Sequence, residues 1–104
     1  MSISKGVALV TGASRGIGRA IALRLANDGY SLALNDIPSN QADLAALAAE
    51  IEGIKYGGRN LRAASITGDV TEEDQVQEMV QKTVKDLGAI DVVSILGVMC
   101  LFGV

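Results

Sequence analysis

Short apolar runs alternate along the chain with segments whose apolar residues recur every three or four positions. The run Val7–Thr11 is short, apolar and bounded by turn residues, which is typical of a buried strand in a parallel sheet. The same reasoning predicts further strands at 32–36, 62–66 and from 90 to 93, and helices at 16–28, 41–52 and 72–87. No linker, repeat or low-complexity segment interrupts the alternation, and we therefore expect one small α/β unit.

Turn and capping residues mark the expected ends of the helices. Two polar pairs have the spacing of N-terminal caps, Asn40 with Asp43 and Thr71 with Asp74. Gly29 and Gly88 follow the first and last helices as stop signals. The apolar stripe expected on the first helix is Ile17, Ile21 and Leu25, and that on the second is Leu44, Leu47, Ala48 and Ile51.

The predicted order of elements also fixes a topology. Successive strand–helix–strand units form right-handed crossovers, so the strands should lie parallel in the order 3-2-1-4. The expected architecture is a partial Rossmann fold of about four strands, with the first two helices on one face and the third on the other. The fourth strand would then be an exposed edge, which predicts self-association or aggregation through that edge.

A glycine-rich turn, Thr11–Gly18, connects the first strand to the first helix. Gly12 permits the tight turn, Gly16 lets the main chain approach a ligand closely, and Gly18 allows the helix to pack closely on the strand. The helix N-terminus adds unpaired N–H groups and about half a positive charge. This combination predicts a binding site for the diphosphate of a dinucleotide.

Asp36 ends the second predicted strand, eighteen residues after Gly18. In a dinucleotide-binding unit, an acid at this position accepts hydrogen bonds from the hydroxyls of the adenosine ribose. The same carboxylate would repel the additional phosphate of NADP. The alternative is a solvated loop aspartate in front of Pro38; we favour the binding role, and NAD as the coenzyme.

The spacing T-G-x-x-x-G-x-G of the turn resembles that of the short-chain dehydrogenase/reductase family rather than the G-x-G-x-x-G form. The resemblance covers about residues 5–93 and includes the helix spacings and the acids at the strand ends. It implies an oxidoreductase that transfers hydride between a nicotinamide coenzyme and a carbonyl or alcohol substrate. We therefore interpret residues 1–93 as the nucleotide-binding half-domain of such an enzyme.

The same resemblance suggests roles for further residues. Arg15 stands where a basic residue often accompanies NADP, although a solvated arginine on an exposed turn is an equal alternative. In the family, Asp69 would bond the adenine amino group and Val70 would pack on the ring; the alternative is an ordinary aspartate at a strand end. Ile17 would lie under the coenzyme or pack in the core. Ser14 brings a hydroxyl to the phosphate turn, although serine is common in turns generally.

The resemblance ends after Val93. The family's Asn-Ala-Gly segment is replaced by Ser94-Ile95-Leu96-Gly97-Val98, and we interpret 94–104 as an aberrant apolar tail of irregular structure. The chain contains no counterpart of the family's catalytic serine and Tyr-x-x-x-Lys, because Tyr30 and Tyr56 are not followed by lysine four residues later. No catalytic residue is therefore predicted, and whether this chain is an enzyme stays open.

Composition narrows the remaining classes of function. The net charge of −3 and the absence of a basic tract argue against nucleic-acid binding. The chain has no histidine and one cysteine, which gives no support for a metal site and excludes an internal disulfide. The apolar C-terminal run is too short for a membrane helix, and residues 1–5 lack the apolar core of a signal peptide. We expect a cytoplasmic protein.

Two functions remain in competition. In the first, the chain is the NAD(P)-binding fragment of a short-chain dehydrogenase/reductase and is inactive alone, because acid–base catalysis needs residues that it lacks. In the second, it is a noncatalytic nucleotide-binding or interaction module that needs a partner chain. The substrate cannot be inferred from these residues.

Overall fold

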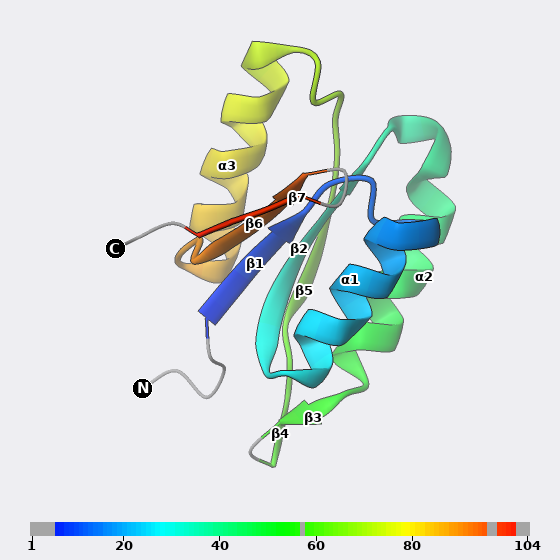
Figure 1. Cartoon of the computed structure of the whole chain (residues 1–104), viewed down its shortest axis with the longest axis vertical. Coiled ribbons are helices and arrows are strands. Elements are labelled where there is room, and N and C mark those ends of the chain that lie inside the picture. Colours follow the sequence, from blue (N-terminus) through cyan, green and yellow to red (C-terminus); the bar gives the residue numbers. More distant parts are fainter. Residues whose placement is uncertain (1–5, 57, 96–97, 102–104) are drawn as a thin grey trace.

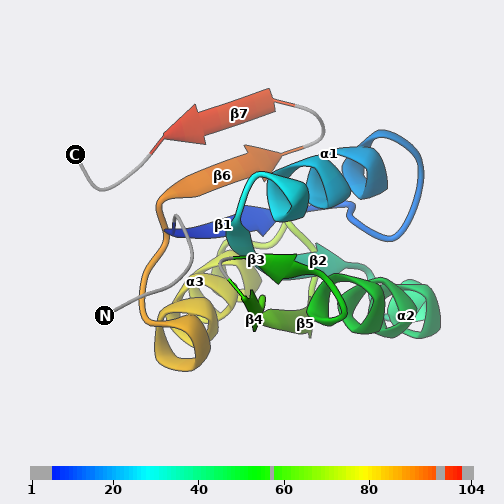
Figure 2. The ribbon, with the colours of Figure 1, turned by 90° about the horizontal axis from the view of Figure 1, so that it is seen from below.

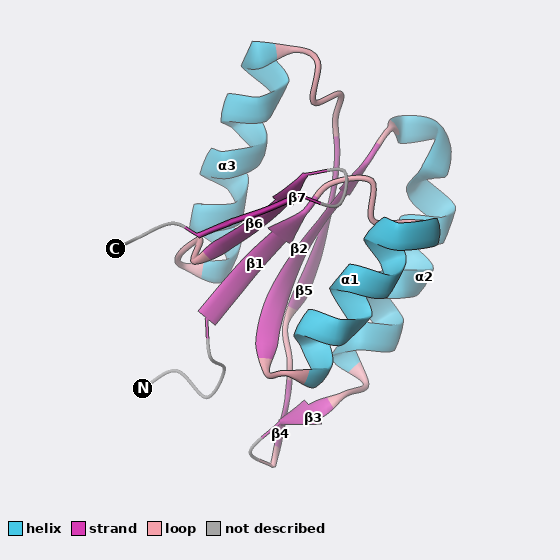
Figure 3. Cartoon of the chain, in the orientation of Figure 1, coloured by secondary structure: helices cyan, strands magenta, loops and turns pink. Residues whose placement is uncertain are grey.

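The computed structural model describes residues 6–56, 58–95 and 98–101. In this part of the chain a five-stranded sheet is flanked by three α-helices (Figures 1 and 3). The sheet has the order β5-β2-β1-β6-β7 and consists of β1 (Gly6–Val10), β2 (Tyr30–Asp36), β5 (Ala63–Thr67), β6 (Val92–Ile95) and β7 (Val98–Leu101). The helices are α1 (Gly16–Asn27), α2 (Gln41–Glu52) and α3 (Glu73–Leu87).

Four of these strands form the predicted parallel sheet. In β1, Ala8 is in register with Leu32 of β2 on one side and with Val92 of β6 on the other. β5 pairs in parallel with the outer side of β2, so the predicted order 3-2-1-4 is confirmed. Because all four run in the same direction, their carboxyl ends meet at one edge of the sheet (Figure 1).

The predicted exposed edge at the fourth strand is wrong. β7 pairs with β6 in the antiparallel direction, with Val93 opposite Cys100, and lies outside it in Figure 2. A strand that reverses direction after β6 can use the unpaired main-chain groups of that edge at once, without a crossover helix. The segment expected to be irregular thus contains a strand at 98–101, whereas Leu96, Gly97 and 102–104 lie outside the described residues.

The helices lie on the two faces of the sheet as predicted, α1 and α2 on one and α3 on the other (Figure 2). The larger core joins alternate strand residues such as Ala8, Leu32 and Leu34 to buried residues of α1 and α2. The smaller core places Leu9, Ala33, Ile66 and Val93 against Met79 of α3. Both faces of the central strands are therefore covered, as their continuous apolar sequence requires.

The predicted capping roles of the polar pairs are wrong. Neither Asn40, at the N-terminus of α2, nor Glu72, at that of α3, caps its helix through a side-chain hydrogen bond. A 3₁₀ turn, η1 (Pro38–Asn40), precedes α2, and the Thr71 hydroxyl donates to Asp69 instead of to the helix. The sequence signals located the helix starts, but the side chain of Thr71 bonds to the preceding loop and that of Asn40 to Asp36 and Arg15.

The buried faces of the helices and the segment 55–60 differ in part from the predictions. All four stripe residues of α2 are buried, whereas in α1 the buried residues are Ala22, Leu25 and Ala26, and Ile17 is 73% exposed. The left-handed φ of Gly88, +94°, ends α3 as predicted. Between α2 and β5, where no strand was predicted, lie two short antiparallel strands, β3 (Lys55–Tyr56) and β4 (Arg59–Asn60).

Candidate functional site

Three loops converge at the carboxyl edge of the sheet, after β1, β2 and β5. A cleft of about 120 Å³ opens between them. It brings four of the predicted site residues together, and its lining is Thr11, Gly12, Asn35, Asp36, Ile37, Gly68, Asp69 and Val70. Such an edge is where open α/β sheets bind ligands.

The turn between β1 and α1 has the geometry that its glycines predict. Gly12 and Gly16 have φ angles of +63° and +57°, which L-residues with a side chain rarely adopt. A Cβ atom on Gly18 would lie 2.1 Å from the Gly12 carbonyl oxygen, so only glycine fits where the helix crosses the turn. The main chain at Gly16 is open, because a Cβ there would meet nothing within 4 Å.

The N-terminus of α1 keeps its positive character. Its N-cap residue, Arg15, makes no side-chain capping bond, and the first turn contains no acidic residue. By contrast, the first turns of α2 and α3 contain Asp43 and Glu73 with Asp74, respectively. No carboxylate in the first turn of α1 therefore offsets its N–H groups and dipole, which suits an anionic ligand.

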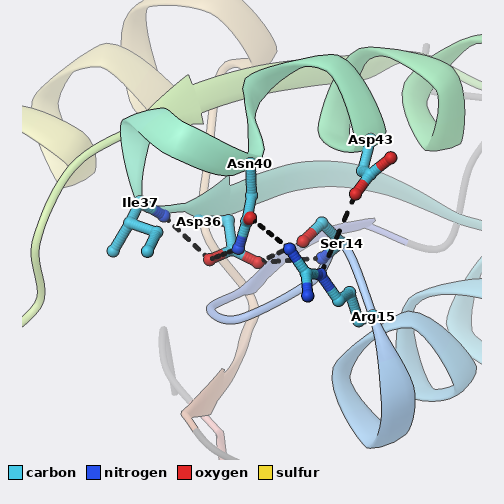
Figure 4. A network of polar contacts seen from close by, with 6 residues as sticks. All are labelled: Ser14, Arg15, Asp36, Ile37, Asn40 and Asp43. Atoms are coloured by element: carbon cyan, nitrogen blue, oxygen red, sulfur yellow. Dashed lines mark hydrogen bonds and ion pairs between the residues drawn. The ribbon is translucent and has the colours of Figure 1, made fainter.

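Asp36 is held in place by a dense set of hydrogen bonds (Figure 4). One carboxylate oxygen, Oδ2, accepts from the Ser14 hydroxyl at 2.5 Å and from the Ser14 N–H at 3.2 Å. The other, Oδ1, accepts from the Ile37 N–H at 2.8 Å and from the Asn40 amide at 3.1 Å. Ser14 thus connects the phosphate turn directly to the acid at the end of β2.

These bonds keep Asp36 ionised. Partial burial raises the pKa of the carboxyl, but the hydrogen bonds from Ser14, Ile37 and Asn40 outweigh burial and lower the pKa below its usual value. A carboxylate at this edge can accept ribose hydroxyls, and it repels a phosphate. Asp36 is therefore not simply a solvated aspartate in a loop.

Arg15 projects from the turn toward η1 and α2. Its guanidinium donates to the Asn40 side-chain oxygen at 2.6 Å and lies 3.8 Å from the Asp43 carboxylate. The side chain is 70% exposed. Arg15 therefore stands beside Asp36 without an ion pair between them, and the two are joined through Asn40 (Figure 4).

Asp69 and Val70 line the cleft from the loop after β5. The Asp69 carboxylate accepts from the Thr71 hydroxyl at 2.7 Å and from the Thr71 N–H at 2.9 Å, and these bonds lower its pKa. The Gly68 N–H donates to the Asp36 carbonyl at 3.0 Å, so this loop is attached to the end of β2. The contact of these two residues with adenine stays a prediction.

Ile17 lies apart from the core and from the lining of this cleft. Its exposure of 73% makes the core-packing alternative wrong. It borders a shallow apolar groove on α1 together with Ile21 and Leu25. The predicted contact between Ile17 and a coenzyme stays a prediction.

Sequence reasoning missed Asn35, which is 1% exposed and lines the cleft. Its amide nitrogen donates to the carbonyls of Ile66 at 3.0 Å and Gly68 at 3.2 Å. The main-chain carbonyl of Asn35 in turn accepts from the N–H of Ala13. Asn35 thus holds the three loops together. In the sequence, an asparagine next to the apolar residues of this strand was the signal that could have identified it.

Replacing Asn35 by alanine should lower the free energy of unfolding by about 2–3 kcal/mol, because two buried carbonyls lose their donor. Urea unfolding followed by circular dichroism measures the change. The matched control is Asn27→Ala, since the exposed Asn27 amide also donates to a main-chain carbonyl, that of Leu23. Equal losses for the two variants would contradict the role assigned to Asn35.

The described residues give no support for a metal site or for a membrane-spanning helix. No group of three histidine, cysteine, aspartate or glutamate residues there could hold a metal ion. No described helix is long and apolar enough to cross a membrane.

Comparison with known proteins agrees with this geometry. The family model for short chain dehydrogenase matches residues 6–97. A short-chain dehydrogenase/reductase of Armillaria gallica is 51% identical over 92 residues, which are 88% of this chain and 33% of that protein. The chain therefore belongs to the short-chain dehydrogenase family, and it spans about a third of the length of the curated relatives that it matches.

Solved structures show the same fold. A blue fluorescent protein from a metagenomic library, in complex with NADPH, superposes with a TM-score of 0.76 at 38% identity and covers 89% of this chain and 36% of that one. A Burkholderia phymatum short-chain dehydrogenase/reductase in complex with NAD gives 0.70 at 26% identity, with 89% and 31% covered. Similar structures thus contain NADPH in one case and NAD in the other. They support a nicotinamide coenzyme for this family but do not decide between the two.

Proposed function

We propose that this chain binds NAD at the carboxyl edge of its sheet. The observation that carries the proposal is the cleft in which Gly12, Asp36, Asp69 and Val70 meet. The turn around Gly16 and the N-terminus of α1 would hold the diphosphate, with Ser14 and Gly18 shaping that turn. Asp36 would accept the ribose hydroxyls, and Asp69 with Val70 would contact the adenine.

The residues present fit such a coenzyme. The contact between Gly18 and Gly12 brings the helix N-terminus next to the strand end, and the open space at Gly16 leaves the main chain accessible. When bound, the nicotinamide would accept or donate a hydride. The described residues would bind and orient the adenosine and diphosphate portion.

The preference for NAD follows from charge. Asp36 is ionised and held by four hydrogen bonds, whereas the cation of Arg15 is bound by Asn40 and approached by Asp43. The ionised Asp36 would therefore repel a 2′-phosphate, while the Arg15 guanidinium that could attract it is already engaged by other groups. In the family, an arginine at this position often accompanies NADP, so the preference needs a direct test.

Isothermal titration of the chain with NAD and NADP provides that test. We expect saturable binding of both, with a Kd for NADP that is about fivefold higher or more, because like charges ~4 Å apart cost about 1 kcal/mol even in water. Cooperative urea unfolding of the same sample shows that it is folded. A folded sample that binds neither coenzyme at millimolar concentration would contradict the proposal.

For the whole protein we propose hydride transfer between the coenzyme and a carbonyl or alcohol, and no catalytic activity for this chain alone. The second candidate, a noncatalytic module that needs a partner chain, is favoured by the lack of a Tyr-x-x-x-Lys sequence. An NADH-dependent carbonyl reduction assay of the whole protein, rather than of this chain alone, separates the two. The predicted cytoplasmic location and the absence of nucleic-acid or membrane partners remain predictions; so does self-association, although not through the edge of β6, which β7 covers.

A further inference from the structure

Asn40 is the residue that connects the two charged groups next to the ribose position. It lies at the end of η1, between Asp36 and Arg15 in Figure 4. Its amide nitrogen donates to Asp36 Oδ1 at 3.1 Å, and its oxygen accepts from Arg15 Nη2 at 2.6 Å. Because an amide has one donating and one accepting end, the carboxylate and the guanidinium together fix its orientation.

The helix that Asn40 precedes does not use this side chain. Asn40 is the N-cap residue of α2 by position, yet it makes no side-chain capping hydrogen bond. Asparagine at such a position ordinarily bonds the first N–H groups of the helix. Its side chain is instead engaged entirely in the site, so replacing it removes no capping bond from α2.

The carboxylate of Asp36 is fully occupied by its neighbours. It accepts four hydrogen bonds, which is about the number that a carboxylate provides sites for. At Oδ1 one donor is the main-chain N–H of Ile37 and the other is the Asn40 side chain, which can rotate away. A ribose hydroxyl can replace that amide as a donor, whereas an ionised 2′-phosphate has no proton to donate.

We infer that Asn40 is a specificity-determining residue, whose amide oxygen engages the Arg15 guanidinium, makes it less available to a 2′-phosphate and so favours NAD over NADP. This inference rests on the proposed coenzyme binding. It assigns Asn40 a positioning role, because the group that would meet the phosphate is Arg15. Asp43, 3.8 Å from the Arg15 guanidinium, is the second restraint on that side chain.

Two substitutions of Asn40 should change the ratio of the NADP Kd to the NAD Kd in opposite directions. Asn40→Ala releases Arg15, and the ratio should fall about threefold to fivefold, the effect of one exposed charged contact. Asn40→Asp keeps the shape of the side chain, adds a negative charge next to Asp36 and holds Arg15 more firmly. The ratio should then rise by a similar factor, which simple destabilisation of the loop would not produce.

The Arg15→Met background tests whether the effect passes through Arg15. If it does, Asn40→Ala should leave the ratio unchanged there, since no guanidinium remains to be released. Ser39→Ala is the matched control, because Ser39 is an exposed polar residue of the same 3₁₀ turn. Isothermal titration with NAD and NADP gives both dissociation constants for each variant, and urea unfolding confirms that each is folded.

The outcomes separate the two proposals. Opposite shifts of the ratio in the two Asn40 variants, with the Asn40→Ala shift disappearing in the Arg15→Met background, support the role of Asn40. Binding of both coenzymes with an unchanged ratio, or an Asn40→Ala shift that persists without Arg15, overturns it while leaving coenzyme binding intact. A folded parent chain that binds neither coenzyme overturns the proposed function, and this inference with it.

Discussion

Gly18→Ala is expected to lower the free energy of unfolding by about 3 kcal/mol, the upper end of the usual cost of overpacking. The added Cβ would lie 2.1 Å from the Gly12 carbonyl oxygen and 2.7 Å from its carbon. Both are main-chain atoms, so no side chain can rotate away to relieve the contact. Only a movement of α1 away from the turn can, and that movement separates the helix N-terminus from the strand end.

Two measurements check this expectation. Urea unfolding followed by circular dichroism gives the stability, and isothermal titration gives the Kd for NAD, which should rise in the variant fraction that stays folded. Gly53→Ala is the control, since Gly53 follows α2 with φ −81° and a new Cβ there would approach no atom closer than 3.4 Å. A Gly18→Ala protein as stable as the Gly53→Ala protein would exclude the close crossing.

Asp36→Asn is expected to raise the Kd for NAD by about tenfold to a hundredfold, the equivalent of 1.5–3 kcal/mol for hydrogen bonds to a charged acceptor. The amide that replaces the carboxylate keeps its shape but has one accepting oxygen instead of two. The Kd for NADP should change less, because the substitution also removes the repulsion of the 2′-phosphate. Titration with both coenzymes measures the two effects.

Glu78→Gln is the control for Asp36→Asn, because it removes an equal charge from an exposed position on α3. It should leave both dissociation constants nearly unchanged. Equal effects of Asp36→Asn on NAD and NADP would show that the carboxylate does not face the ribose.

The same carboxylate should make stability depend on pH. The pKa of Asp36 is lower in the folded chain than its usual value, so ionised Asp36 stabilises the fold above the ordinary aspartate pKa. This contribution is lost as the pH falls through the lowered folded pKa, that is, below about pH 4. The difference in unfolding free energy between the parent and Asp36→Asn should therefore shrink on acidification. A difference independent of pH would contradict the assignment.

The repeating strand and helix pattern was sufficient to predict the topology. Continuous apolar runs at β1 and β2 can be buried only in a sheet covered on both faces, and the helical intervals between them are long enough for crossovers. The stripe of α2 was predictable because Leu44, Leu47, Ala48 and Ile51 are all buried on one side. In α1, by contrast, small residues pack on the sheet while Ile17 stays exposed, which apolar spacing alone does not distinguish.

Polar side chains were harder to place than apolar ones. Asn40 and Thr71 have the sequence of helix caps, yet their side chains bond to Asp36 with Arg15 and to Asp69, respectively. The competing acceptors, Asp36 and Asp69, stand only four and two residues before these side chains, and the helix-cap pattern does not exclude such local bonds, whereas Arg15 reaches Asn40 from the turn after β1. The pairing of β7 with β6 was missed for a similar reason, because an apolar run after the last predicted strand does not specify which edge it joins.

The sequence by itself determined the parallel sheet, the placement of the helices and the glycine turn, since these follow from local spacing and from the steric freedom of glycine. Tertiary structure decided which side chains share the site. It brought Ser14 onto Asp36 from 22 residues away, and it placed Asn35 among three loops. Hydrogen bonds between loops depend on distances that exist only after the strands have paired.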